Sequence, residues 1–196
     1  MESAKIQDLR ALPHDRHKTW WKNFMIKYNC QRVCEIGVRE GINFRLMVKH
    51  NPILAVAVDS WISDGNKYRN DVGFTQEELN QQYEDIKKTY IDRPSVKIYR
   101  GYSFDVVKEF DDEFFDLVYI DADHSFDGCY KDIIDWYPKV KKGGILCGHD
   151  YEHLVGRTRQ EDKILFGVIE AVDKFVKDNN IASFFIVQPN VWGIIK

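Results

Sequence analysis

The sequence predicts an α/β fold, namely a doubly wound, mostly parallel seven-stranded sheet with an antiparallel strand at its C-terminal end. Strand-like and helical patterns alternate along the 196 residues, which is typical of parallel strands joined by crossover helices. The run Ile53–Val58 (ILAVAV) is apolar throughout, as in a strand buried on both faces. Only Gln188-Pro189-Asn190 separates the last two strand-like runs, so these strands must be antiparallel neighbours.

The strands are expected where β-branched and other apolar residues run together between polar or glycine-containing segments. The first run stops at Gly37, the second and fourth stop at Asp59 and Asp121, and the third and fifth stop at or near Gly101 and Gly148. In chain order the predicted strands are Arg32–Ile36, Ile53–Val58, Val96–Tyr99, Phe115–Ile120, Ile145–Cys147, Ser183–Val187 and Val191–Ile195.

The helices are expected between these strands, where apolar residues recur with helical spacing. Thr75 and Glu78 have the spacing of a capping box at the start of the third helix. Pro138 ends the helix that runs from Phe126 to Tyr137. Lys142-Gly143-Gly144 is predicted to be a turn. The predicted helices are Thr19–Tyr28, Ile42–His50, Thr75–Tyr90, Phe104–Phe110, Phe126–Tyr137 and Ile164–Lys177.

Composition favours one cytoplasmic domain that acts on a small molecule. No linker-like stretch divides the chain, so we expect a single domain of residues 1–196, with a helical extension (1–30) and a core (31–196). The formal net charge of −3 gives no basic field for nucleic acid, and no apolar run is long enough to span a membrane. We expect reduced thiols at Cys30, Cys34, Cys129 and Cys147. The aromatic Trp20-Trp21 pair suggests packing or a homo-oligomer interface.

Candidate functional residues follow the strands, because ligands of open α/β sheets bind outside the carboxyl ends of the strands. After the first strand, Gly37 permits a tight turn and a close approach of the backbone to a ligand. Asp59 ends the second strand about 20 residues later, where an acid accepts hydrogen bonds from the ribose hydroxyls of a nucleoside. Ser60 and Trp61 follow, and the Trp61 ring offers an aromatic face for adenine. The alternative for Asp59 is a turn cap.

The chain resembles the class I methyltransferases that use S-adenosylmethionine (SAM), and two stretches carry the resemblance. Cys34-Glu35-Ile36-Gly37-Val38-Arg39-Glu40-Gly41 is similar to their motif I, usually written ExGxGxG, although Arg39 stands where a glycine is common. The segment Phe115–Tyr151 resembles the small-molecule O-methyltransferases, close to a branch that acts on sugars and other natural products. The resemblance covers about Arg32 to Lys196 and implies SAM as cofactor, lined by Glu35, Gly37, Gly41, Asp59 and Asp121.

Gly101 and Ser103 follow the third strand and belong to the same expected cofactor site. In small methyltransferases a Gly-x-Ser at this point lies along the adenine, which the resemblance implies here for Gly101-Tyr102-Ser103. Ser103 could equally be the N-cap of the helix that begins at Phe104.

The residues after the fourth and fifth strands are expected to face the substrate. In metal-dependent relatives, an aspartate after the fourth strand and two residues after the fifth strand hold Mg²⁺, and the matching positions are Asp121, His149 and Asp150. His149 would favour Zn²⁺, Mn²⁺ or Fe²⁺ over Mg²⁺, and His124 could be a further ligand. In a metal-free alternative, His124 or His149 is the general base for the substrate hydroxyl, oriented by Asp121, Asp123 or Asp150.

The sequence thus predicts a SAM-dependent methyltransferase that methylates a hydroxyl of a small molecule. One alternative is an NAD(P)-dependent oxidoreductase, although the GxGxxG motif is absent. The other alternative is a catalytically silent, SAM-binding scaffold domain. Two loops, Trp61–Phe74 and Tyr151–Asp162, are expected to form a substrate lid, with Arg157 and Arg159 placed to bind an anionic group.

Overall fold

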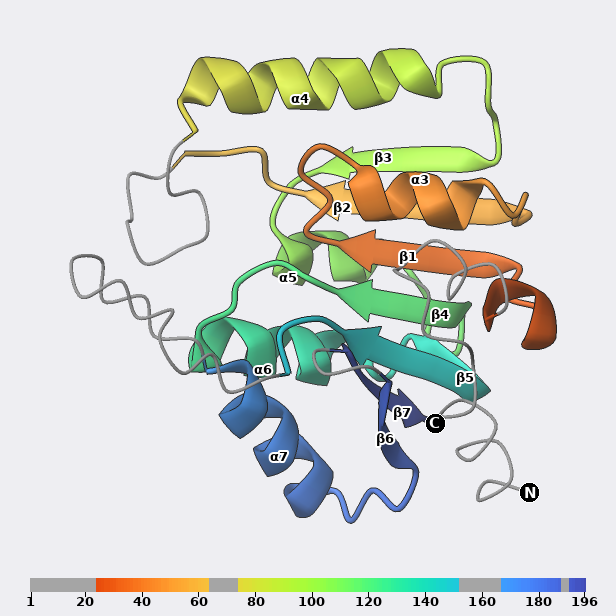
Figure 1. The fold of residues 1–196 in the computed structure, drawn as a ribbon, viewed down its shortest axis with the longest axis vertical. Helices are drawn as coiled ribbons and strands as arrows, with labels where there is room; N and C mark the ends of the chain where they lie inside the picture. The colour runs from red at the N-terminus through yellow and green to blue at the C-terminus, as the bar shows by residue number, and fades with distance from the viewer. Residues whose placement is uncertain (1–23, 64–73, 152–166, 188–190) are drawn as a thin grey trace.

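The computed structural model describes residues 24–63, 74–151, 167–187 and 191–196. Its strands are β1 (Arg32–Ile36), β2 (Leu54–Asp59), β3 (Val96–Arg100), β4 (Phe115–Ile120), β5 (Val140–Gly148), β6 (Phe184–Val187) and β7 (Val191–Ile195). Within the described ranges they form one seven-stranded sheet with the order β3-β2-β1-β4-β5-β7-β6 (Figure 1). Strands β1 to β5 pair in parallel, whereas β7 runs antiparallel to both β5 and β6. The predicted fold class is confirmed.

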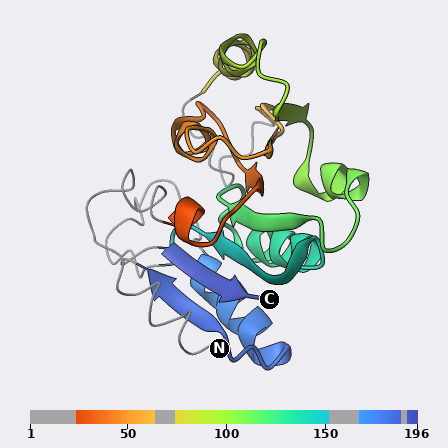
Figure 2. The same ribbon diagram turned by 90° about the vertical axis from the view of Figure 1, so that its right-hand side faces the viewer.

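The helices that connect the strands pack on both faces of this sheet. They are α3 (Ile42–Val48), α4 (Gln76–Thr89), α5 (Ser103–Val106), the 3₁₀ turn η1 (Val107–Glu109), α6 (Phe126–Trp136) and α7 (Val168–Asp178). Figure 2 shows α3 and α5 on opposite sides of the sheet. Two buried clusters match this arrangement, one including residues of α3 and α4 and the other including residues of α5, α6 and α7.

The capping box predicted for α4 is present. The Thr75 hydroxyl accepts a hydrogen bond from the backbone N–H of Glu78, and the Glu78 carboxylate accepts one from the backbone N–H of Thr75 at 2.7 Å. These two bonds satisfy donors that the first helical turn would otherwise leave without partners. The local sequence alone therefore fixes where α4 begins.

Two predictions of local structure were wrong. The single helix expected at Phe104–Phe110 is a short α-helix followed by a 3₁₀ turn, and Tyr102 rather than Ser103 is its N-cap. The expected turn at Lys142-Gly143-Gly144 lies inside the longer strand β5, where the pairing with β4 shifts register. Gly143 has a φ of 75°, so this glycine permits an irregularity that lets the strand continue instead of ending.

Part of the N-terminal prediction lies outside the described residues. Residues 24–27 are helical, and Phe24 and Met25 are buried in the core, but Trp20 and Trp21 fall in the range that the structure does not describe. The division into residues 1–30 and 31–196 stays a prediction for the same reason. Among the described residues, all four cysteines are buried free thiols, as predicted, and no helix is both long and apolar enough to cross a membrane.

Candidate cofactor and active site

The carboxyl ends of β1, β2 and β4 meet at Gly37. The backbone N–H of Gly37 donates to the Val58 carbonyl at 2.9 Å, and the N–H of Asp121 donates to the Ile36 carbonyl at 2.8 Å. A Cβ atom on Gly37 would lie 2.0 Å from the Asp121 carbonyl oxygen, and the φ of 87° also favours glycine. Only glycine therefore allows the chain to turn here between two neighbouring strand ends.

The turn continues to Gly41, which has a φ of 72° and is the N-cap residue of α3. Arg39, in the position where related motifs carry a glycine, also has a left-handed φ of 48°. Its guanidinium lies over the Phe74 ring, 4.8 Å from the ring centre. The arginine thus keeps the glycine-like backbone of the loop and adds a contact with the segment that precedes α4.

Asp59 binds the turn that follows β1. Its Oδ2 accepts the backbone N–H of Arg39 at 2.8 Å, and its Oδ1 accepts the backbone N–H of Trp61 at 2.8 Å. Burial raises the pKa of this carboxyl, while the backbone N–H groups oppose the rise. Asp59 therefore acts as the turn cap that the sequence left as an alternative, and each of its oxygens accepts one of these backbone bonds.

The structure buries Trp61, the residue expected to offer a face to adenine. Only 1% of Trp61 is exposed, and its ring packs against Tyr83 with centroids 5.1 Å apart. The indole N–H donates to the Arg39 carbonyl at 3.1 Å. Ser60 accepts the backbone N–H of Ile62 at 3.4 Å. Trp61 thus joins the loops after β1 and β2, and its contact with adenine stays a prediction that would require the ring to be uncovered.

Glu35, in β1, is a buried acid, only 1% exposed. Its Oε1 accepts a hydrogen bond from the Asn43 amide at 3.1 Å, while its Oε2 is buried and has no hydrogen-bond partner among the described residues. Burial raises the pKa of Glu35 well above its usual value, and the nearby charges of Asp121 and Asp59 add to the rise. This oxygen fits a ligand that carries a positive charge or a donor, such as the ammonium group of SAM.

Ser103 lies at the end of β3, beside the β2 end. The backbone N–H of Gly101 donates to the Asp59 carbonyl at 2.8 Å, which places the Gly101–Ser103 loop next to the expected ribose position. The half-buried Ser103 hydroxyl donates to the carboxylate of Asp132 on α6. Sequence reasoning missed Asp132, although a signal was present, because an acid interrupts the apolar spacing of Cys129, Ile133 and Trp136.

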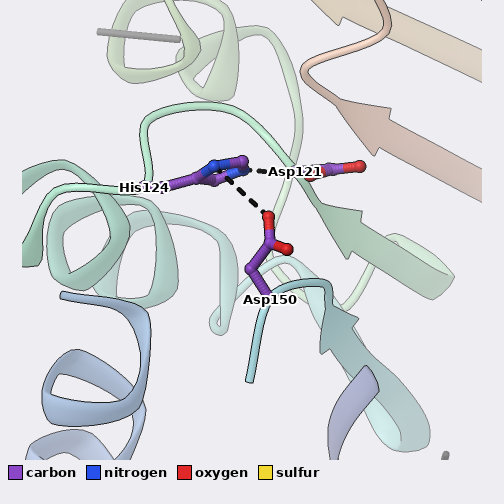
Figure 3. Close-up of side chains that lie close together, drawn as sticks. All are labelled: Asp121, His124 and Asp150. Atoms are coloured by element: carbon purple, nitrogen blue, oxygen red, sulfur yellow. Dashed lines mark hydrogen bonds and ion pairs between the residues drawn. The ribbon is translucent and has the colours of Figure 1, made fainter. Parts of the chain in front are cut away.

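His124 lies between two carboxylates at the ends of β4 and β5 (Figure 3). Its Nε2 is 3.0 Å from Asp121 Oδ1, and its Nδ1 is 3.3 Å from Asp150 Oδ2. The other oxygen of Asp150, Oδ1, lies 3.1 Å from His149 Nδ1. Because Ile120 pairs with Gly148, the residues after both strands start at the same level of the sheet. The structure thus brings all four predicted residues together.

The geometry groups His124, and not His149, with the two predicted aspartates, and the metal ligands themselves stay a prediction. Asp121, His124 and Asp150 offer ligand atoms that lie within 4.8 Å of one another, whereas His149 is not part of this group. His149 Nδ1 lies near Oδ1 of Asp150, the oxygen that faces away from His124. Asp150 has a left-handed φ of 56°, a backbone conformation that costs free energy in a non-glycine residue and is often found at functional sites. The two predicted lid loops, including Arg157 and Arg159, lie almost wholly outside the described residues.

Comparisons with solved structures support the fold. A candidate caffeoyl-CoA O-methyltransferase from Staphylococcus aureus superposes with a TM-score of 0.66 at 17% identity, covering 100% of this chain and 90% of that one. The O-methyltransferase NovP gives a TM-score of 0.60 at 16% identity, covering 100% and 88%. The methyltransferase PaMTH1 of Podospora anserina, solved with S-adenosylhomocysteine (SAH) bound, gives 0.64 at 16% identity, covering 98% and 86%.

Sequence comparison identifies the family. No curated protein sequence gives a significant match. A family model described as a methyltransferase domain matches residues 34–151, which is more than half of the chain and runs from motif I to the end of the segment after β5. The chain therefore belongs to the methyltransferase-domain family and is a class I SAM-dependent methyltransferase.

Proposed function

We propose that the protein transfers the methyl group of SAM to a hydroxyl oxygen of a small molecule such as a sugar or another natural product. The observation that carries the proposal is the acidic character of the strand ends. Glu35 is the next-to-last residue of β1, Asp59 ends β2 and Asp121 follows β4. The charges of Asp59 and Asp121 act on the buried Glu35. Such a site favours a cationic cofactor over the anionic pyrophosphate of NAD(P).

In this proposal the chain holds SAM through groups whose geometry is already described. Glu35 Oε2 binds the ammonium group, and Gly37 allows the cofactor to approach the backbone closely. A carboxylate has about four acceptor positions. Asp59 therefore keeps acceptor positions for the ribose hydroxyls after binding the backbone of Arg39 and Trp61. Ser103 lies along the adenine. SAM itself supplies a methyl group on a sulfonium, which is a good leaving group.

The substrate faces Asp121, His124, His149 and Asp150. Both ring nitrogens of His124 lie near carboxylates, so its contacts fix the ring between β4 and β5. His149 Nδ1 lies near Asp150, which orients that ring in turn. In a metal-free reaction one of these histidines takes the proton of the substrate hydroxyl, and the close placement of oxygen and methyl group supplies most of the rate.

Titration calorimetry with SAH tests the cofactor assignment. We expect one site per chain with a dissociation constant in the micromolar range, and no measurable binding of NADH or NADPH. Binding of a nicotinamide cofactor without binding of SAH would favour the oxidoreductase alternative. SAM binding without methyl transfer to any member of a panel of hydroxylated acceptors would favour the silent scaffold.

We propose further that a divalent cation assists the reaction, held by Asp121, His124 and Asp150. The proposal rests on the three ligand atoms within 4.8 Å of one another and on the mixed oxygen and nitrogen donor set, which suits Mn²⁺ or Zn²⁺ as well as Mg²⁺. When bound, the cation would lower the pKa of the substrate hydroxyl.

Metal titrations of chelator-treated protein test this site and its revised ligands. Asp121→Asn and His124→Gln should weaken Mn²⁺ binding at least about tenfold, in line with the loss of a ligand contact. His149→Gln is the matched control, since it removes a neighbouring histidine that lies outside the group. An unchanged midpoint of urea unfolding in all three variants would show that the fold is intact. Loss of Mn²⁺ binding in Asp121→Asn and His149→Gln, but not in His124→Gln, would restore the ligand set inferred from sequence.

A further inference from the structure

Asp132 is a buried acid. Neither the packing of the fold nor the proposed cofactor contacts explain why an acid occupies this position. It lies on the face of α6 that packs into the core, is only 4% exposed, and accepts a hydrogen bond from the Ser103 hydroxyl. Burying a carboxyl costs free energy even when it has one partner. Burial, with the charges of Asp123 and Asp135, raises its pKa to about 7, while the bond from Ser103 opposes the rise. An apolar residue at this position would pack more favourably.

The Asp132–Ser103 bond links the segments that follow β3 and β4. These strands are separated in the sheet by β2 and β1, whose ends hold Asp59 and Gly37. Helices α5 and α6 pack in the same buried cluster, on the sheet face opposite α3 and α4. Ser103 is half-buried. It follows Gly101 by two residues, and the Gly101 backbone N–H donates to the Asp59 carbonyl. The bond therefore joins the two sides of the region where the base of a nucleoside lies if its ribose is bound at Asp59.

The direction of this bond decides what Ser103 can offer a ligand. A serine hydroxyl has one donor hydrogen and two acceptor lone pairs. When its hydrogen points to Asp132, the oxygen is left as an acceptor only. The 6-amino group of adenine is a donor, whereas the 6-carbonyl of hypoxanthine is an acceptor and would face the serine oxygen without a hydrogen between them.

We infer that Asp132 is a positioning residue of the cofactor site, which holds the Ser103 hydroxyl as an acceptor and thereby selects a 6-aminopurine cofactor. The inference rests on the proposed function, because it requires the nucleoside to be bound at Asp59. Asp132 itself does not contact the cofactor in this account. It acts through the orientation of Ser103.

The test compares the dissociation constants of SAH and S-inosylhomocysteine, in which the 6-amino group is replaced by a carbonyl. The wild-type chain should bind SAH about tenfold more tightly. Ser103→Ala and Asp132→Ala should each reduce that ratio about three- to tenfold, because the oriented acceptor is lost. Asp132→Asn should keep the ratio, because its amide oxygen still accepts the serine hydrogen. Asp135→Asn is the matched control on the same helix, where Asp135 forms an ion pair with Lys131 at 2.8 Å.

Each outcome separates the inference from the proposed function. If Asp132→Ala weakens both ligands equally and leaves the ratio unchanged, Asp132 is only structural and the inference is wrong. If Asp132→Ala does not fold, Ser103→Ala takes its place in the test. An unchanged ratio of the two dissociation constants in Ser103→Ala would also overturn the inference. If the wild-type chain binds SAH but does not discriminate against S-inosylhomocysteine, the inference fails while the proposed function stands. If SAH does not bind the wild-type chain, the proposed function fails and the inference falls with it.

Discussion

At the ends of the strands, close contacts with neighbouring backbone determine which residue type can occupy a position. Gly37 lies where a Cβ atom would overlap the Asp121 carbonyl, and Asp59 caps the turn that Gly37 begins. Glu35 is an acid buried in strand β1, and Asp132 is an acid buried in helix α6. In each case the local free-energy cost is set against a contact that shapes the cofactor site, as is common at functional positions.

Gly37→Ala should destabilise the fold and abolish SAH binding. The substituted Cβ would lie 2.0 Å from a backbone oxygen, so the strand ends must separate. Gly143→Ala is the control, because it has a similar φ of 75° but lies outside the site. Urea unfolding should show a loss of about 1 kcal/mol for the control, from the left-handed backbone alone, and clearly more for Gly37→Ala. Equal losses would mean that the close approach to Asp121 is not required.

Asp132 makes the stability of the protein depend on pH. Its pKa is raised from 3.8 to about 7, so the folded state prefers the neutral carboxyl. The stabilisation is complete below the unfolded pKa and is lost as pH rises from about 4 through about 7, a difference of about 4 kcal/mol at most. Asp132→Asn, which cannot ionise, should therefore gain stability relative to the wild type between pH 4.5 and pH 8, measured by urea unfolding. A parallel pH dependence of the two chains would contradict the assignment.

At the scale of elements, α4 shows how local signals and packing combine. The capping box of Thr75 and Glu78 sets its start, and Leu79 and Ile86 bury its inner face. Ile86 also approaches Gly41, because a Cβ on that glycine would lie 3.3 Å from Ile86 Cδ1. The helix thus supports the turn after β1 from the outside.

Thr75→Ala should lower the free energy of unfolding by about 1 kcal/mol, because the N–H of Glu78 loses its acceptor. Thr75→Ser retains the hydroxyl and should recover most of that loss. Denaturant unfolding measures both variants. If Thr75→Ala unfolds at the wild-type midpoint, the cap contributes nothing to stability and the start of α4 depends on packing alone.

The elements also show what sequence patterns can predict. Strands β1, β4 and β7 have the predicted bounds, because each is a compact apolar run between clear stops. The 3₁₀ turn η1 and the irregularity in β5 were missed, because both depend on how neighbouring elements pack and not on periodicity. Helix propensity alone does not distinguish a continuous helix from a short one that turns into 3₁₀ geometry.

At the scale of the whole molecule, strand order turns residues distant in sequence into one site. The positions of Gly37, Asp59 and Asp121 were predictable, because parallel strands expose their carboxyl ends at one edge. The orientation of side chains was not. His124, and not His149, lies between Asp121 and Asp150, and Trp61 packs inward against Tyr83, because tertiary packing selects those rotamers. The Ser103–Asp132 bond needed the spatial meeting of α5 and α6.

From the arrangement of the strand ends we predict that the cofactor site binds the positively charged end of the cofactor at Glu35. Glu35→Gln keeps the size of the side chain and the bond from Asn43 but removes the ionisable carboxyl. A charged hydrogen bond is worth about 1.5 to 3 kcal/mol, which corresponds to about a tenfold to hundredfold change in affinity. 5′-Methylthioadenosine, which shares the nucleoside but lacks the amino-acid group, serves as the matched ligand.

The decisive measurement is calorimetric titration of SAH and of 5′-methylthioadenosine into the wild-type chain and into Glu35→Gln. The account predicts that Glu35→Gln loses at least about tenfold in affinity for SAH and keeps its affinity for 5′-methylthioadenosine. Equal affinity of both chains for SAH, or an equal loss for both ligands, would contradict the claim that the buried acid of motif I holds the cationic end of the cofactor.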